Sequence, residues 1–142
     1  IYRSVIPEIW DSLENMLTTG EIVSVKETYK ELELQFSKES NILAWLKKYK
    51  RSFTNPTNDE ALIVSEIYSY RNFQNGVPEK SIRDGRPVAD AFLVAKAKVL
   101  NGTVVTREKY SPNSAKIPNL CNRVCVKFIG EEEFQLILKK KS

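Results

Sequence analysis

Apolar residues recur at helical spacing through most of the chain, and short β-branched runs interrupt them. The first stretch shows the pattern: Ile6, Trp10, Leu13 and Leu17 lie three or four positions apart and would share one helix face. Because helical stretches separate the β-branched runs, the order of elements predicts an α/β fold with a parallel sheet. The predicted helices lie at about 7–19, 26–36, 40–50, 59–70, 87–100 and 131–141, and the predicted strands are EIVSV (21–25), TVVT (103–106) and VCVKFI (124–129).

Local signals define several boundaries of these elements. Thr57 and Glu60 have the spacing of a capping box, and Asn101 followed by Gly102 is typical of a helix C-terminus. The last helix has acids in its first turn and lysines in its last, as the helix dipole favours. Turn-forming residues predict loops at SFTNPTN (52–58), RNFQNGVPEKSIRDG (71–85) and SPNSAKIPN (111–119).

The amino-acid composition excludes more kinds of active site than the net charge does. The chain has 142 residues, which suits one domain, and a net charge of +4 that permits a polyanionic partner without requiring one. It contains no histidine, which excludes Ser/His and Cys/His nucleophile pairs and His-ligated zinc. Cys121 and Cys125 are too few for a disulfide scaffold, so we expect two free thiols beside a strand. No membrane span or signal peptide is recognisable, and we expect a cytoplasmic protein that does not bind membranes.

Three acids lie where a parallel sheet would gather its ligands, at the carboxyl ends of the strands. Glu31 is in the helix after EIVSV, and Glu108 comes two residues after TVVT. Asp90 is expected in the first turn of the helix from about Pro87 to Leu100. Converging carboxylates repel one another unless a hard cation lies between them, and Mg²⁺ or Mn²⁺ takes oxygen ligands of this kind.

Each acid also has a simpler interpretation. Asp90 could cap its helix or interact with the helix dipole, as acids in a first turn usually do. Glu31 could be a solvated helix residue, and Glu108 could be a surface charge between Arg107 and Lys109. Spacing alone does not distinguish these interpretations from a metal site.

Three stretches together resemble the PIN-domain family, and in particular the VapC-type toxins of bacterial toxin–antitoxin pairs. They are SVKETYKEL, VADAFLVAKAKVLNGTVVTRE and KIPNLC leading into VCVKF. Glu31 with Leu32 matches the acid-Leu pair that follows the family's second strand, although Glu27 could take that place. Asp90 to Ala97 matches an acid-Ala-apolar pattern, and Thr106 to Glu108 matches "T-x-acid", with Glu where Asp is commoner.

The resemblance implies a fold, a site and partners. It implies a single PIN-like domain over 1–142 with a three-layer α/β/α arrangement around a parallel sheet. Glu31, Asp90 and Glu108 would be the catalytic and metal-binding residues for Mg²⁺ or Mn²⁺, and Arg107 and Lys109 would contact nucleic acid. The implied activity is a metal-dependent ribonuclease, a toxin whose partners are RNA, a cognate antitoxin and, as a further option, a second copy of the chain.

One family feature is missing. PIN domains begin with a central strand that ends in Asp-Thr-Asn, and nothing before Ile1 supplies it. We therefore expect the position between the EIVSV and TVVT strands to be filled by a strand from an upstream segment or another chain. The alternatives are a non-catalytic PIN-like module with an incomplete metal site, and an α/β domain that binds a small ligand.

Overall fold

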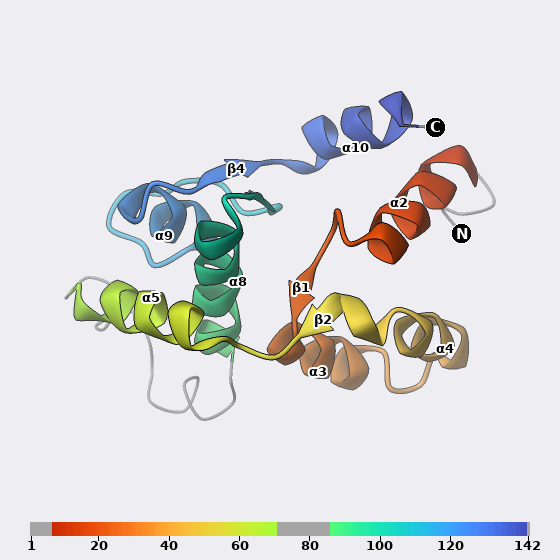
Figure 1. Ribbon diagram of the computed structural model, residues 1–142, viewed down its shortest axis with the longest axis horizontal. Coiled ribbons are helices and arrows are strands. Elements are labelled where there is room, and N and C mark those ends of the chain that lie inside the picture. Colours follow the sequence, from red (N-terminus) through yellow and green to blue (C-terminus); the bar gives the residue numbers. More distant parts are fainter. Residues whose placement is uncertain (1–6, 71–85, 142) are drawn as a thin grey trace.

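The protein, described from a computed structural model, is a mixed α/β structure that is mostly helical. The structure describes residues 7–70 and 86–141, so the loop predicted at 71–85 lies outside the described residues. Figure 1 shows the arrangement. The elements in chain order are α2 (Pro7–Thr19), β1 (Ser24–Val25), α3 (Lys26–Gln35), α4 (Ser40–Lys48), a 3₁₀ turn (Lys50–Ser52), β2 (Phe53–Thr54), α5 (Asn58–Ser69), α8 (Arg86–Leu100), β3 (Thr103–Val105), α9 (Ile117–Arg123), β4 (Lys127–Ile129) and α10 (Glu131–Lys140).

The described strands are parallel, as predicted, but they form two separate pairs. β1 pairs with β2 in the register Ser24 to Phe53, and β3 pairs with β4 in the register Val105 to Ile129. All three predicted strands are present, although each is shorter than its β-branched run. Within the described residues β1 and β3 are not paired with each other, so a single sheet joining all three predicted strands would need a further strand between them.

Two elements differ from the sequence-based assignment. Phe53 and Thr54 were expected in a turn but form β2, because a two-residue strand is defined by its partner and carries no periodic pattern of its own. The segment at 111–119 was expected to be a loop, but α9 begins within it at Ile117. Pro118 occupies the first turn of α9, where the missing N–H of proline is harmless.

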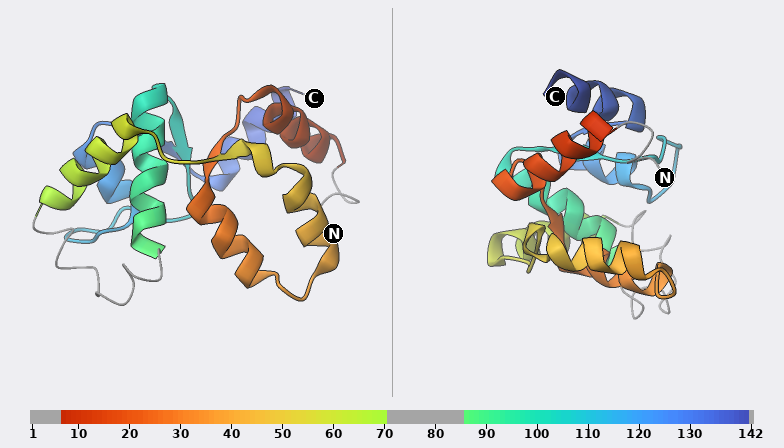
Figure 2. Two further views of the ribbon diagram at one scale, coloured as in Figure 1. Left: turned by 60° about the horizontal axis from the view of Figure 1, so that its bottom comes forward. Right: turned by 90° about the vertical axis from the view of Figure 1, so that its right-hand side faces the viewer.

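Helix α8 is the centre of the fold. It contacts β1 and β3, one strand from each pair, and it packs against α3, α5 and α9 (Figures 1 and 2). Ala91, Val94 and Ala95 are fully buried, and the small alanines allow neighbouring elements to approach closely. Burial of a valine such as Val94 contributes roughly 1.5–3 kcal/mol. The core cluster comprises Val64, Ile67, Ala91, Val94, Ala95, Val104, Ile117, Leu120, Cys121, Val124 and Val126.

The C-terminus of α8 directs the chain into β3. Asn101 has a positive φ of 56°, and the Gly102 N–H donates to the Ala97 carbonyl over 2.8 Å. The Asn101 N–H donates to the Lys98 carbonyl, so the pair forms a Schellman motif with Asn rather than Gly in the left-handed position. The helix stop predicted at Asn101 and Gly102 is confirmed.

A buried ion pair links α5 to α8. The Lys96 Nζ lies 3.0 Å from Glu60 Oε1, and the two side chains are 10% and 1% exposed. The other Glu60 oxygen accepts from the Thr57 N–H, while the Glu60 N–H donates to Thr57 Oγ1, which confirms the capping box. Burial acts to raise the pKa of Glu60, but the hydrogen bonds from Thr57 and the charge of Lys96 outweigh it and lower that pKa. Glu60 therefore caps the start of α5 and also binds α5 to α8 through Lys96.

Helices α2 and α10 complete the other half of the molecule. The Trp10 and Trp45 rings meet edge to face, with centroids 5.9 Å apart, and join α2 to α4. Helix α10 packs against α2, and Lys141 pairs with Glu21 over 2.8 Å. The C-terminal end of the described chain therefore lies beside its N-terminal helix, as the second view in Figure 2 shows.

A gap separates the two strand pairs. β1 lies between β2 and the β3–β4 pair in Figures 1 and 2, yet β1 and β3 are not paired with each other in the described residues. Both strands pack on α8, and Val25 at the end of β1 and Val104 in the middle of β3 are 0% and 7% exposed. Unpaired backbone groups at such inner edges cost roughly 1–3 kcal/mol each when they are buried.

We predict that an additional strand, from an upstream segment or another chain, occupies this gap. Amide hydrogen exchange should then slow by at least about tenfold at the inner edges of both β1 and β3 when that segment is present, relative to 1–142 alone. Amides at the outer edge of β2 serve as the control and should not change. Equal exchange at both inner edges in the two samples would contradict the prediction.

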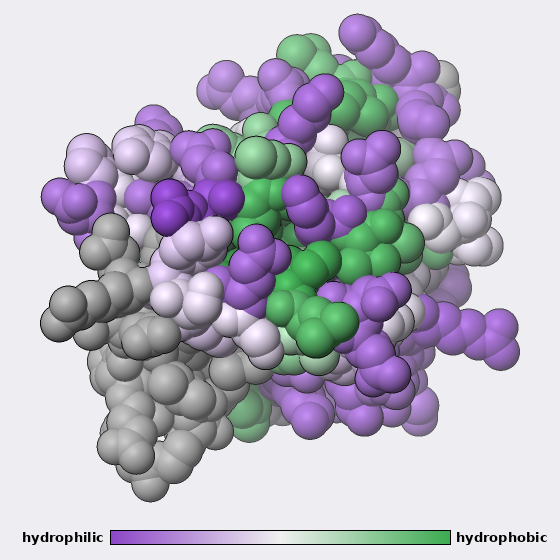
Figure 3. Space-filling model, turned by 60° about the vertical axis from the view of Figure 1, so that its left-hand side comes forward, coloured by the Kyte–Doolittle hydropathy of each residue, from purple (hydrophilic) through white to green (hydrophobic). Residues whose placement is uncertain are grey.

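Hydrophobic side chains also reach the surface. Figure 3 shows a hydrophobic band on one face that is interrupted and bordered by hydrophilic residues. The exposed large apolar residues include Val99, Leu100 and Val105 at the junction of α8 and β3, and Leu136 and Ile137 on α10. Apolar surface that is left exposed in this way is typical of contact surfaces.

Candidate functional site

The three candidate acids come from three different elements. Glu31 is in the second turn of α3, which follows β1 without a break. Glu108 lies three residues after the end of β3. Asp90 is the fifth residue of α8, because the helix begins at Arg86 and has no acid in its first turn.

The position of Asp90 corrects the expectation that it lies in the first helical turn. The unpaired N–H groups of a helix, and most of the dipole effect, are confined to that turn. Asp90 lies beyond it, so capping of α8 does not explain why a carboxylate interrupts this apolar helix.

Electrostatics connects Asp90 to the other two acids. Burial, then the nearby charges of Glu108 and Glu31, raise the pKa of Asp90 from 3.8 to about 7. Like charges gathered in one region disfavour joint ionisation. Glu31 and Glu108 are therefore close enough to Asp90 for their charges to act on it. Tyr68 of α5 borders it, since burial and the charge of Asp90 raise the pKa of Tyr68 to about 12.

Two hydrogen bonds fix the conformation of Glu108. Its N–H donates to Thr106 Oγ1 over 3.1 Å, and its Oε1 accepts from the Ile117 N–H over 3.2 Å. Ile117 is the first residue of α9, so an anion at this position is favoured by the free N–H groups there. Glu108 is exposed, but these bonds orient it toward α9.

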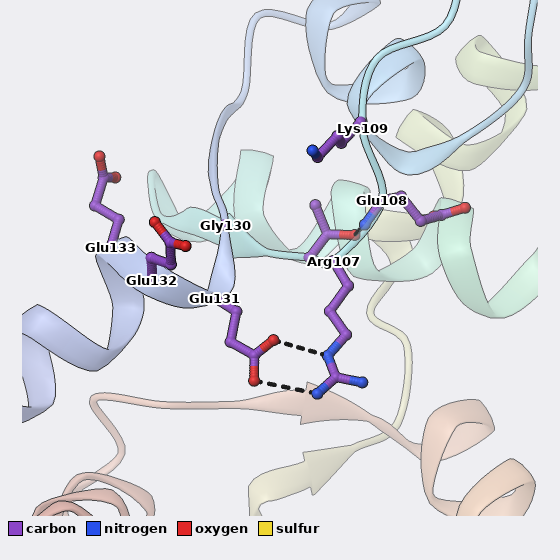
Figure 4. A pocket seen from close by; sticks show the side chains of 8 residues that line it. Arg107, Glu108, Lys109, Gly130, Glu131, Glu132 and Glu133 are labelled. Carbon is purple, nitrogen blue, oxygen red and sulfur yellow. Dashed lines mark hydrogen bonds and ion pairs between the residues drawn. The ribbon is translucent and has the colours of Figure 1, made fainter.

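A cleft of about 680 Å³ lies at the carboxyl ends of β3 and β4. Figure 4 shows that Glu108 points away from the ion pair at its centre. We expected Glu108 and Asp90 to share a cleft with Glu31 on the opposite wall, but Asp90 and Glu31 do not line this one. Its lining residues are Thr106, Arg107, Glu108, Lys109, Gly130, Glu131, Glu132 and Glu133.

The acids of α10 were not recognised as part of this region from the sequence. Glu131, Glu132 and Glu133 were assigned only to the helix dipole, which their position in the first turn of α10 supports. They also follow directly on β4 and Gly130, so the rule that selected Glu108 would have selected them. Glu131 forms a two-point ion pair with Arg107, a candidate nucleic-acid contact. Lys109, the other candidate, is exposed and lines the cleft.

The donor atoms suit a hard divalent cation, although they are not gathered for direct joint coordination. No group of three or more Cys, Asp or Glu side chains within 7–70 and 86–141 is arranged to hold a metal ion. Near Glu31, however, Glu27 Oε2 and Thr28 Oγ1 are buried and make no hydrogen bond within the described residues. Oxygen donors of this kind, with water molecules completing the shell, fit Mg²⁺ or Mn²⁺.

Glu31 is the better match than Glu27 for the acid that faces Asp90. The charge that acts on Asp90 from α3 is that of Glu31. Glu27 lies in the first turn of α3, where it also serves the helix dipole.

The cysteines take no part in this region. Cys121 is buried and Cys125 is exposed, and both are free thiols, as predicted. Burial raises the pKa of Cys121 to about 12, so it remains a protonated thiol near neutral pH and is not an effective nucleophile.

Comparison with known proteins identifies one family. None of the helices within the described ranges is long and apolar enough to cross a membrane. Neither the curated proteins nor the solved structures include a match to the chain. One family model, described as "Domain of unknown function (DUF4411)", matches residues 1–141. The chain therefore belongs to the DUF4411 family.

Proposed function

We propose that the protein is a metal-dependent ribonuclease of the PIN type. The observation that carries this proposal is the environment of Asp90, a half-buried carboxyl whose pKa is raised by burial and by Glu108 and Glu31. A carboxyl with a perturbed pKa, with acids of other elements close enough to act on it, is typical of functional sites. The three-layer α/β/α arrangement, with a central strand between β1 and β3, is part of the proposal.

The side chains of the proposed site divide into metal ligands, groups that orient them and contacts to phosphate. Glu31, Asp90 and Glu108 would hold Mg²⁺ or Mn²⁺, and the bound ion would activate water for attack on an RNA phosphodiester. The hydrogen bond from the Ile117 N–H keeps Glu108 oriented, and Thr106 fixes the turn that presents it. Lys109 and Arg107 would contact the phosphate backbone.

The partners follow from the same proposal. A ribonuclease toxin acts on cytoplasmic RNA and is held inactive by an antitoxin until release. The hydrophobic band in Figure 3 is a suitable contact surface for that antitoxin or for a second copy of the chain.

One observation favours a second candidate, a non-catalytic PIN-like module. The described acids are not grouped for direct coordination of one ion. If the strand that fills the gap between β1 and β3 brings no further ligand, the site would hold its cation too weakly for catalysis. The two candidates differ in one measurable property, RNA cleavage that depends on a divalent ion.

Cleavage of a long single-stranded RNA by the full-length protein tests the proposal. We expect cleavage with Mn²⁺ or Mg²⁺ and none with EDTA. Glu31→Gln should reduce the rate by at least about 100-fold, because loss of even a supporting partner of a metal ligand costs 10- to 100-fold. Glu33→Gln is the matched control, since Glu33 is an exposed acid on the same helix. Absence of cleavage under all metal conditions would favour the non-catalytic module.

A further inference from the structure

Arg107 and Glu131 meet because of the register between β3 and β4. Val105 is opposite Ile129, so the residues two positions further on, Arg107 and Glu131, also lie opposite each other. The guanidinium donates through Nε to Oε2 and through Nη2 to Oε1, both over 3.1 Å (Figure 4). The carboxylate therefore binds Arg107 at two points in one plane.

This ion pair is exposed. The Arg107 and Glu131 side chains are 79% and 48% accessible to solvent. An ion pair in such a setting shifts an equilibrium by only about fivefold or less. An RNA phosphodiester offers the guanidinium the same two-oxygen geometry and the same single negative charge, and the neighbouring phosphates of the chain add further charge. Replacement of the carboxylate by a phosphate is thus chemically matched and energetically easy.

The charges around this ion pair determine how many cations of the cleft a polyanion can contact. The cleft lining contains two cations, Arg107 and Lys109, and four acids, which are Glu108 and the row on α10 that starts with Glu131. As long as Glu131 binds Arg107, Lys109 is the cation in the cleft lining that has no ion pair in the described residues. A polyanion can therefore contact both cations of the cleft only if Arg107 exchanges Glu131 for a phosphate group.

We propose that Glu131 is an internal competitor for phosphate at Arg107, and that an RNA phosphate displaces it on binding. The inference rests on the proposed function for its choice of RNA as the ligand. Glu131 lowers the affinity of the cleft for any phosphate that lacks enough neighbouring contacts. A polyphosphate chain, which makes several contacts at once, therefore displaces Glu131 more easily than a single phosphate group does.

Binding of a labelled oligonucleotide tests this competition without catalysis. The probe is a 5′-fluorescein 12-mer of oligouridylate, titrated with the full-length protein in EDTA and followed by anisotropy. Glu131→Gln should tighten Kd by about fivefold, the change that corresponds to an exposed ion pair. Glu132→Gln and Glu133→Gln remove the same charge from the same helical turn and should change Kd by no more than about twofold.

A double-mutant cycle assigns the effect to Arg107. In an Arg107→Gln background, Glu131→Gln should change Kd by less than about twofold, because the partner it releases is gone. Glu131→Asp retains the charge but shortens the side chain, and it should give a gain smaller than that of Glu131→Gln. Thermal unfolding confirms that each variant is folded.

Several outcomes would overturn the inference. They are equal gains in all three glutamine variants, a gain that persists without Arg107, and no binding by either the wild type or Glu131→Gln. Failure of the proposed function is recognised separately. A protein whose binding depends on Glu131 but that never cleaves RNA with Mn²⁺ would retain the inference and lose the nuclease.

Discussion

Asp90→Asn should stabilise the metal-free protein at pH 8 while it abolishes RNA cleavage. Burial, Glu108 and Glu31 raise the pKa of Asp90 from 3.8 to about 7 in the folded chain. Between about pH 4 and 7 the folded chain keeps a proton that the unfolded chain has released. Stability therefore falls as the pH rises through this window, and the full penalty is present above pH 7.

The size of this penalty follows from the two pKa values. Each pKa unit corresponds to about 1.4 kcal/mol, so the change from 3.8 to about 7 sets an upper limit of roughly 4 kcal/mol. The amide of Asn has nearly the same volume and does not ionise. Asp90→Asn should therefore raise the free energy of unfolding at pH 8 by about 2–4 kcal/mol and leave it nearly unchanged at pH 3.5.

Urea unfolding in EDTA at both pH values measures this difference. Asp59→Asn is the control, because Asp59 is an exposed acid in the first turn of α5. Its variant should follow the pH dependence of the wild type. A wild-type protein whose stability does not decrease between pH 4 and 7 relative to Asp90→Asn would contradict the raised pKa.

The same variant also separates metal binding from general repulsion. A divalent ion at ten times its Kd should stabilise the wild type at pH 8 by about 1.4 kcal/mol, since it binds only the folded chain. Asp90→Asn should show little of this stabilisation, and its cleavage rate should fall by at least about 100-fold. Cleavage that survives in Asp90→Asn would remove Asp90 from the site.

The second large effect concerns the ion pair of Glu60 and Lys96. Lys96→Met should destabilise the protein by about 3–5 kcal/mol, because it leaves a buried carboxylate without its counter-charge. The nearly complete burial of Glu60 and the 3.0 Å contact place this pair at the high end of such effects. Lys47→Met, on an exposed position of α4, is the control and should change the unfolding free energy by less than about 0.5 kcal/mol.

A double substitution shows whether the loss comes from the unpaired charge. Lys96→Met combined with Glu60→Gln removes both charges, and it should recover most of the stability that Lys96→Met loses. The Gln side chain can still accept from the Thr57 N–H, so the start of α5 is preserved. Urea unfolding of the four proteins gives the coupling energy directly, and additive losses would show that the two side chains act independently.

The local elements of this protein were predictable because local interactions determine them. The helix starting after Thr57 and the helix stop at Asn101 depend on contacts within a few residues, and both were correctly assigned. Apolar periodicity located α2, α3, α4, α5, α8 and α10, since each buries one stripe against the rest of the chain. The strands of β1, β3 and β4 were found from their β-branched residues, although not their lengths.

Elements that depend on a distant partner were not predictable. β2 exists because Phe53 pairs with Ser24, and no pattern within SFTNPTN indicates that pairing. The pairing of β1 with β2 and of β3 with β4 depends on which strands are adjacent, a property of the assembled core. The start of α8 at Arg86 places the half-buried Asp90 beyond the first turn, which removes the cap as an alternative interpretation.

The sequence by itself determined the types of residue that could form a site, and it placed Glu31 and Glu108 after strands. It nominated Glu31, Asp90 and Glu108, because the carboxyl ends of parallel strands gather at one edge. Only the tertiary structure decided their environment, since desolvation and Coulomb repulsion depend on distances between elements far apart in the chain. It also decided that Arg107 binds Glu131, because the register of β3 against β4 brings together two charges 24 residues apart.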